Sequence, residues 1–389
     1  CRVDNSFETE GNKMKKVLFA STALVATASV AAAEVSFSGY GRFGIGYVED
    51  RTGTVTSTFG TAVSTTATAG GAGSVGILTS SAATVTGVDV DDVILVSRFR
   101  LNIDVNVDTD SGVEFFGRVR LQADDDGNGE AGTAGLNGAL FSVIFGGLRV
   151  DAGNIAGAFD NLPGYYGTEI GLELFAGQYS GVDYSFATYT STGAGVNGVF
   201  FQYAVGDFAF GASYDQGATS VTTAAPGTGP VTVSEGADRW DVSVAYTFNN
   251  ITAALAYGQT EATSGPNPSL TVLTLGAEFG DFSGTLFIAN DDNTSPLGLS
   301  DGVPPRSANS GLATDGTAWG LSGAYNLGAA TTLQFAYGDG SADGDLRQIA
   351  VGAIYDLGGG ASLRGGIGQN KRGNTGSVTV ADFGAQFNF

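Results

Sequence analysis

The chain has 389 residues, of which 62 are glycine and only 14% are charged, so it is poorer in charge than an average soluble domain. Acidic residues outnumber basic residues 39 to 17, and this excess argues against a nucleic-acid partner, which requires a basic face. Histidine is absent, and the single cysteine and single methionine are Cys1 and Met14. Histidine-based triads, cysteine nucleophiles and Cys/His zinc sites are therefore excluded.

The first segment is typical of a secretory signal peptide. Residues 14–33 contain two lysines, then about fourteen mostly apolar or small residues, and finally Ala31, Ala32 and Ala33. This run is too short for a membrane anchor, which needs about 20 apolar residues. We expect cleavage after Ala33, and we interpret residues 1–13 as non-native upstream translation. The mature domain would then be residues 34–389, with 13 bases, 36 acids and one lysine, Lys371.

The mature sequence alternates between apolar and polar residues instead of following a helical period. In residues 93–108, Phe99, Leu101 and Ile103 alternate with Arg98, Arg100 and other polar residues. Because successive side chains of a strand point to opposite sides, this pattern predicts a strand with one apolar and one polar face.

Segments of this kind, punctuated by turn residues, predict sixteen strands. They are 34–48, 91–107, 112–123, 138–145, 147–152, 196–205, 207–216, 237–248, 251–260, 269–279, 282–290, 315–327, 330–338, 345–357, 361–369 and 377–389. Short turns alternate with long polar stretches at 49–90, 124–137, 153–195, 217–236 and 291–314. An exported chain with this pattern is predicted to form an all-β, 16-stranded antiparallel transmembrane β-barrel with short periplasmic turns, long outer loops and a water-filled lumen.

Several segments also resemble a known family. The start MKKVLFASTALVATASVAAAEVSFSGYGRFGIGY, the runs SRFR and TDSGVEFFGRVR, and the ending YDLGGGASLRGGIGQN with VADFGAQFNF are similar to the general diffusion porins of Gram-negative bacteria, in particular the Rhodobacter-type branch. The resemblance implies a homotrimer in the outer-membrane bilayer, a third long loop (153–195) that folds inward as a constriction, and Phe389 as the terminal aromatic read by the outer-membrane insertion machinery.

Two sets of charged residues are the candidate pore residues. The alternation of side chains along each predicted strand places six arginines on the lumen face: Arg42, Arg98, Arg100, Arg118, Arg120 and Arg364. All of them except Arg364 lie on the first three predicted strands. The resemblance supports Arg42, Arg98, Arg100 and Arg120 as basic positions. It also implies that the acids of the third loop face this basic wall: Asp160, Glu169, Glu173 and Asp183. Opposed charges would create a transverse field that favours small hydrophilic solutes. Two alternatives remain open. The arginines could lie on a lumen face where any polar residue would serve, and the acids could be scattered over a partly ordered surface loop.

Calcium is the one ligand for which the sequence offers candidates. Asp124, Asp125 and Asp126, with Glu130 nearby, and the pair Asp291 and Asp292 are rich in carboxylate oxygens. Their spacing matches no EF-hand, and a solvated acidic loop is the favoured interpretation. We therefore expect no cofactor and assign no metal.

The predicted function is an outer-membrane porin for passive diffusion of ions and small hydrophilic solutes, weakly cation-selective because of the acidic excess, and not an enzyme. A substrate-specific porin remains open. A secreted acidic calcium-binding surface or adhesive protein would carry G-G-x-G-x-D repeats, which are absent from the sequence. A barrel hydrolase would have to rely on carboxylates alone, whereas the predicted wall carries bases.

Overall fold

The computed structural model describes residues 33–59, 81–125, 131–217, 220–222, 232–234, 236–262, 265–294, 315–373 and 376–389. The predicted upstream residues, nearly all of the predicted signal segment, and residues 60–80 of the first loop lie outside these ranges.

Sixteen long strands form the wall within the described part of the chain, and their bounds lie within a few residues of those predicted. They are β1 (Glu34–Val48), β4 (Val93–Asp108), β5 (Glu114–Asp124), β7 (Leu140–Phe145), β8 (Leu148–Gly153), β9 (Asn197–Val205), β10 (Phe208–Gln216), β13 (Arg239–Phe248), β14 (Ile251–Thr260), β15 (Ser269–Phe279), β16 (Phe282–Asp292), β17 (Gly316–Leu327), β18 (Thr331–Gly340), β19 (Leu346–Gly358), β20 (Ala361–Arg372) and β21 (Val378–Asn388). The two-residue strand β6 (Gly135–Leu136) also pairs with β5.

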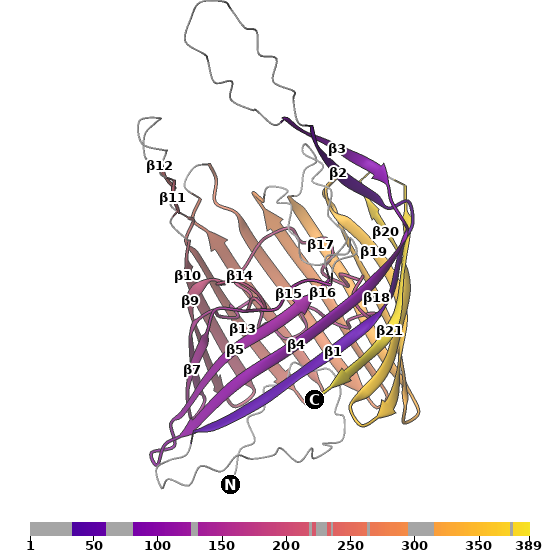
Figure 1. Cartoon of the computed structure of the whole chain (residues 1–389). Helices are drawn as coiled ribbons and strands as arrows, with labels where there is room; N and C mark the ends of the chain where they lie inside the picture. Colours follow the sequence, from indigo (N-terminus) through magenta and orange to yellow (C-terminus); the bar gives the residue numbers. More distant parts are fainter. Residues whose placement is uncertain are drawn as a thin grey trace, which may run out of the picture.

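The sheet closes because the first and last strands pair. β1 is antiparallel to β4 on one side and to β21 on the other, and the strands tilt around the barrel (Figure 1). The seam includes two backbone hydrogen bonds, from Gly39 N to Phe389 O at 2.9 Å and from Phe389 N to Gly39 O at 3.0 Å. Closure leaves the sheet of the barrel without a free edge strand among the described residues, which is the requirement for strands in lipid. The predicted 16-stranded antiparallel barrel is confirmed.

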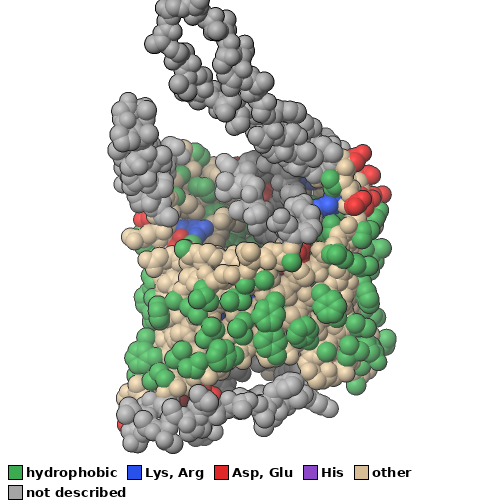
Figure 2. Space-filling view, in the orientation of Figure 1, with side chains coloured by type: hydrophobic (Ala, Val, Ile, Leu, Met, Phe, Trp, Pro, Cys, Tyr) green, Lys and Arg blue, Asp and Glu red, His purple; other side chains and the backbone are tan. Residues whose placement is uncertain are grey.

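The alternation in the sequence becomes an apolar outside and a polar inside. Phe37 of β1 is 63% exposed and Leu95 of β4 is 77% exposed, although both are large apolar side chains. Figure 2 shows such side chains gathered in a band across the visible face of the wall, with charged side chains above it at the rim. An exposed apolar band of this extent is the surface that a barrel presents to lipid.

The short connections are tight turns at one end of the barrel. Asn249, between β13 and β14, adopts φ 54°, and Gly146, between β7 and β8, adopts φ 59°. Positive φ is the conformation that two-residue hairpins require, and glycine and asparagine tolerate it best. Because neighbouring strands are antiparallel, the strand ends that lead into the long connections lie at the opposite end of the barrel.

Two long loops contain structure that the sequence analysis left as polar loop. In the first loop, β2 (Thr52–Phe59) pairs with β3 (Ser81–Asp89), and in the 217–236 loop, β11 (Ser220–Thr222) pairs with β12 (Thr232–Ser234). Threonine and valine favour strands, but without apolar alternation these segments did not stand out. No helix in the described ranges is long and apolar enough to cross a membrane.

Residues 154–196, which we call the inner loop, contain no strand and fold into the barrel, as predicted. The largest buried apolar cluster lies between this loop and the wall. Phe159, Tyr165 and Tyr184 of the loop pack there with Leu270 of β15 and Phe287 of β16. The buried core of this protein is therefore the contact between the inner loop and one side of the wall.

Candidate functional site

The predicted arginines of β1, β4 and β5 are brought together on the inner face of adjacent strands. Arg42 is the register partner of Arg98, and Arg98 and Arg100 lie opposite Asp124 and Gln122 of β5. Two further arginines follow along β5, Arg118 opposite Asp104 and Arg120 opposite Asn102. We call these five arginines the basic wall. Arg364 lies on β20, separated from β1 by β21.

Glu173 of the inner loop contacts this basic wall directly. Its carboxylate oxygens lie 2.8 Å from Arg42 Nη2 and 2.7 Å from Arg98 Nη2. Arg98 also donates to Asp124 at 2.7 Å through Nε and at 2.5 Å through Nη2. Arg42 Nη1 donates to Leu172 O at 2.8 Å. One acid of the loop thus lies between two guanidinium groups of the basic wall.

Two of the remaining arginines of the wall have no carboxylate partner among the described residues. Arg100 donates to Gln122 at 2.6 Å and lies 5.0 Å over the Tyr40 ring. Arg120 donates to Asn102 and to Ser191, each at 2.8 Å, and lies 4.6 Å over the Tyr189 ring. Cation–π contacts stabilise these guanidinium groups without neutralising them.

The other two arginines differ in how far they are neutralised. Arg118 forms a bidentate pair with Asp104, at 2.7 and 2.8 Å, so its charge is balanced within the wall. Arg364 donates to Ser362 at 3.2 Å, and in the described part of the chain it has no acid within salt-bridge distance. Arg100, Arg120 and Arg364 are therefore the arginines on this side of the lumen that form no ion pair among the described residues.

Among the described residues, the three other predicted acids of the loop form no salt bridge with the five arginines of the basic wall. The Asp160 carboxylate accepts from the Tyr166 hydroxyl and, at 3.2 Å, from Tyr189 N, and burial raises the pKa of Asp160. Glu169 is exposed and close enough to Arg364 to interact electrostatically. Asp183 lies beside Asp291 of β16, whose carboxylate accepts from Asp183 N at 2.7 Å. Of the four acids, Glu173 contacts the basic wall directly and Asp160 lies within electrostatic reach of Arg120. Asp183 lies against a different part of the barrel.

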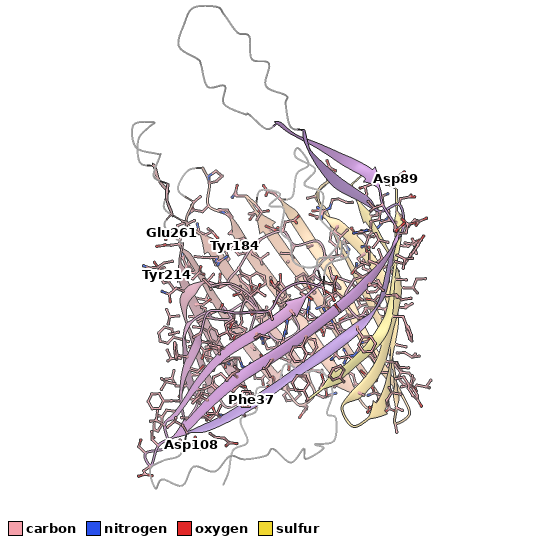
Figure 3. The ribbon with its side chains drawn as sticks, viewed as in Figure 1. Phe37, Asp89, Asp108, Tyr184, Tyr214 and Glu261 are labelled. Carbon is pink, nitrogen blue, oxygen red and sulfur yellow. The ribbon has the colours of Figure 1, made fainter. Side chains whose placement is uncertain are left out.

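Wall residues that the sequence analysis missed hold the inner loop in place. Asp382 of β21 accepts from the backbone N–H groups of Leu172, Glu173 and Leu174 at distances from 2.7 to 3.0 Å. Gln348 of β19 accepts from Gly177 N at 2.7 Å. Figure 3 labels Tyr184 of the loop, which lies between Glu261 near the long-loop end and Asp108 near the short-turn end.

The Asp382 contact depends on the local loop conformation. Gly171 has φ 67°, and a Cβ at that position would overlap the Asp382 carboxylate, so glycine is required for the close approach. The alternation of side chains along β21 is enough to predict that Asp382 lies on the inner face of the barrel. It does not show which loop segment the carboxylate meets.

The predicted calcium ligands are partly engaged by arginine. One oxygen each from Asp124, Asp125 and Glu173 lie within 4.8 Å of one another, while Asp126 and Glu130 lie outside the described residues. The Asp124 and Glu173 oxygens already accept from Arg98. A calcium ion at this position would have to compete with that guanidinium, so the donor set does not favour it.

The C-terminal residue lies at the seam of the barrel. The Phe389 ring stacks on Phe99 of β4, with centroids 5.6 Å apart and an interplanar angle of 20°. The side chain remains 44% exposed. Phe389 therefore belongs to the outer apolar surface, as its predicted parity requires.

These features define a class of protein. A closed antiparallel barrel with an apolar exterior, a charged lumen and a loop folded into that lumen is a membrane channel through which solutes diffuse.

The sequence model for Gram-negative porins matches residues 20–375, and the chain belongs to this family. A porin of Fuscovulum blasticum is 28% identical over 362 residues, which cover 92% of this chain and 100% of the relative. A porin of Rhodobacter capsulatus is 29% identical over 317 residues, 77% of this chain and 95% of the relative.

The solved structure of a triple mutant of Rhodopseudomonas blastica porin is similar in fold, with a TM-score of 0.62 and 23% identity over 92% of this chain and 100% of that one. The predicted resemblance is confirmed, and the protein is an outer-membrane diffusion channel. Membership of this family implies a channel and not an enzyme.

Proposed function

We propose that the channel is a general diffusion porin for ions and small hydrophilic solutes, with a weak preference for cations at low salt. The observation that carries the proposal is the contact of Glu173 with Arg42 and Arg98, because it fixes an acidic loop segment against a basic wall inside the lumen. Fixed charges of both signs order water across the lumen and disfavour apolar solutes.

The weak cation preference follows from two opposing effects. The mature chain carries 36 acids and 13 bases, so the surface potential concentrates cations at the mouths over a Debye length of about 10 Å at 0.1 M salt. Inside the lumen, Arg100, Arg120 and Arg364 attract anions. These effects largely offset each other, and the difference that remains favours cations.

Reversal potentials across a KCl gradient in planar bilayers test the proposal. We expect a small cation-selective potential at millimolar salt that fades towards molar salt. Strong anion selectivity at low salt would contradict it. A saturable block of the conductance by one sugar or organic acid would instead favour the alternative of a substrate-specific porin.

The mature protein is proposed to begin at Glu34, after removal of the signal segment by the export machinery. The residues Ala31, Ala32 and Ala33 supply the small side chains that the signal peptidase requires. The intact mass of protein isolated from outer membranes should correspond to residues 34–389. A mass that includes residues 1–33 would show that the segment is retained.

Phe389 is proposed to act in assembly rather than in conduction, and the working form is proposed to be a homotrimer. Loss of the Phe99 stacking pair costs only about 0.5–1.5 kcal/mol, too little to unfold the barrel. Phe389→Ser should therefore lower the outer-membrane yield while leaving the single-channel conductance of the assembled fraction unchanged. A normal yield would exclude a role for Phe389 as an insertion signal, and Phe387→Ser is the matched control for the loss of an outer aromatic.

The charge of Glu173 is expected to make selectivity depend on pH. Burial raises the pKa of Glu173 above its ordinary value, although Arg42 and Arg98 act in the opposite direction. As the pH falls through this raised pKa, the carboxylate takes up a proton and the lumen gains positive charge. The cation preference should therefore decrease at a higher pH than the ordinary glutamate pKa of about 4.3 predicts.

Reversal potentials of Glu173→Gln, with Glu114→Gln as the control, check this expectation. The Glu173→Gln channel should show the low-pH selectivity at neutral pH and little further change on acidification. A pH dependence equal to that of the unmodified protein would assign the titration to another group.

A further inference from the structure

Two basic side chains lie next to each other on the outer face of the barrel. Arg347 of β19 and Lys371 of β20 are register partners. The neighbouring pair, Gln348 and Asn370, is buried inside the barrel and joined by a hydrogen bond of 2.6 Å. Since successive side chains alternate between the two faces of the sheet, Arg347 and Lys371 point outward.

This basic pair borders a groove of about 230 Å³ on the outer surface. The groove is lined by Tyr337, Arg347, Ile349, Gln369, Lys371 and Ser377. Further towards the short-turn end, on the same face, Val351 and Ile367 are exposed at 50% and 55%. The groove therefore begins where the apolar band ends, at the rim that carries the long loops.

The two positive charges are not balanced within the described part of the chain. Neither Arg347 nor Lys371 has a carboxylate within salt-bridge distance there. Asp339 lies on the same face of β18, and its carboxylate accepts from the Tyr337 hydroxyl at 2.7 Å and from Gly340 N at 2.9 Å without forming an ion pair with either base. Like charges opposite each other on paired strands are destabilising. Because the chain has few bases, two of them side by side on the outer face indicate that an anion offsets the repulsion.

We propose that this groove binds the phosphate group of an outer-leaflet membrane lipid. Arg347 and Lys371 supply charge-assisted donors from two sides, and Gln369 and Ser377 supply neutral polar groups. The acyl chains of the same lipid lie on the apolar surface that starts at Ile349. The proposal rests on the outer-membrane location of the barrel and not on its solute preference, because none of these side chains faces the lumen.

The position favours lipid over the other occupants that could neutralise the pair. A free phosphate ion would satisfy the charges but would leave the adjoining apolar surface of Ile349 and Val351 uncovered. A second copy of the chain would have to present an acid at this height. A lipid with a phosphate headgroup fits both parts of the surface, because the groove connects a basic rim with an apolar band.

Native mass spectrometry of the full mature channel in detergent, titrated with bisphosphorylated lipid A, tests the proposal. Each base near a membrane surface changes affinity for anionic lipid by about fivefold, so Arg347→Gln with Lys371→Gln should weaken binding roughly 25-fold. The control Arg347→Lys with Lys371→Arg keeps both charges and should retain most of the binding. Heat-modifiable gel migration verifies that each variant is folded.

Further measurements distinguish a lipid phosphate from a free phosphate ion as the bound group. Dephosphorylated lipid A should bind weakly, and millimolar inorganic phosphate should displace little bound lipid. Equal binding by the double glutamine variant or by the dephosphorylated lipid would overturn the proposal, as would full displacement by inorganic phosphate. Loss of subunit association without loss of lipid binding would assign the groove to an interface between copies. The conductance of the double variant should not change, so this result is independent of the proposed solute preference.

Discussion

Replacing Arg100 and Arg120 together by alanine is expected to raise the permeability ratio of K⁺ to Cl⁻ by about fivefold at low salt. Both guanidinium groups lack a carboxylate partner in the described part of the chain and lie on the lumen face. At about 8 Å in water, each unit charge changes the free energy of a passing ion by about 0.5 kcal/mol. K⁺ and Cl⁻ respond with opposite sign, so removing two charges changes the difference between the two ions by about 2 kcal/mol before screening. At 0.1 M salt the Debye length of about 10 Å roughly halves this difference to about 1 kcal/mol, which is a factor of about five.

The effect should be electrostatic and should therefore depend on salt. At 1 M salt the Debye length is about 3 Å, so the selectivities of the variant and of the unmodified channel should converge. Reversal potentials measured across KCl gradients at several mean concentrations give the permeability ratio of each channel and its dependence on salt.

A paired substitution elsewhere in the same wall provides the control. Asp104→Asn with Arg118→Gln removes a bidentate ion pair and leaves the net charge of the lumen unchanged. This variant should keep the selectivity of the unmodified channel. If it shifts the permeability ratio as much as the Arg100 and Arg120 variant does, the shift reflects a change in lumen shape and not in uncompensated charge.

Asp382→Ala is expected to release the segment of the inner loop around Glu173 from the wall. The Asp382 side chain accepts from three consecutive backbone N–H groups, and hydrogen bonds to a charged group contribute about 1.5–3 kcal/mol each. If half of this is recovered from water, the segment loses at least about 2 kcal/mol, and its locally open population rises by about 30-fold.

The release should appear in single-channel recordings as a noisier current. Only the contacts with Arg42 and Arg98 would then hold the segment around Glu173, so the segment would detach and return more often and the width of the constriction would fluctuate. The rest of the loop should stay in place because Gln348, Ser322 and Asp291 hold other segments of it by backbone hydrogen bonds.

Asp356→Asn is the matched control for this substitution. Asp356 lies on the same inner face near the short turns, where its carboxylate accepts from Gly358 N at 2.8 Å, and it forms no hydrogen bond with the inner loop in the described part of the chain. Asp356→Asn removes one negative charge from the lumen, as Asp382→Ala does. A quiet current in Asp382→Ala, or equal noise in both variants, would show that Asp382 does not anchor the loop.

The barrel itself could be predicted because its signal is local. Alternation with period two depends only on neighbouring residues, so the strand from residues 93 to 108 shows its two faces without any knowledge of its partners. The same parity assigned Arg42, Arg98 and Arg100 to the lumen and Phe389 to the outside. Closure then followed from the chemistry of lipid, which tolerates no open sheet edge.

Which charges meet across the lumen was decided only by the tertiary structure. Glu173 lies far from Arg42 and from Asp382 along the chain, and the pairing of these residues depends on where the inner loop docks. That docking results from many long-range contacts, such as Phe159 and Tyr165 against β15 and β16, which leave no periodic trace in the sequence. The family resemblance alone therefore placed all four loop acids opposite the arginines, whereas the packing of the loop put Glu173 between Arg42 and Arg98 and held Asp183 against Asp291.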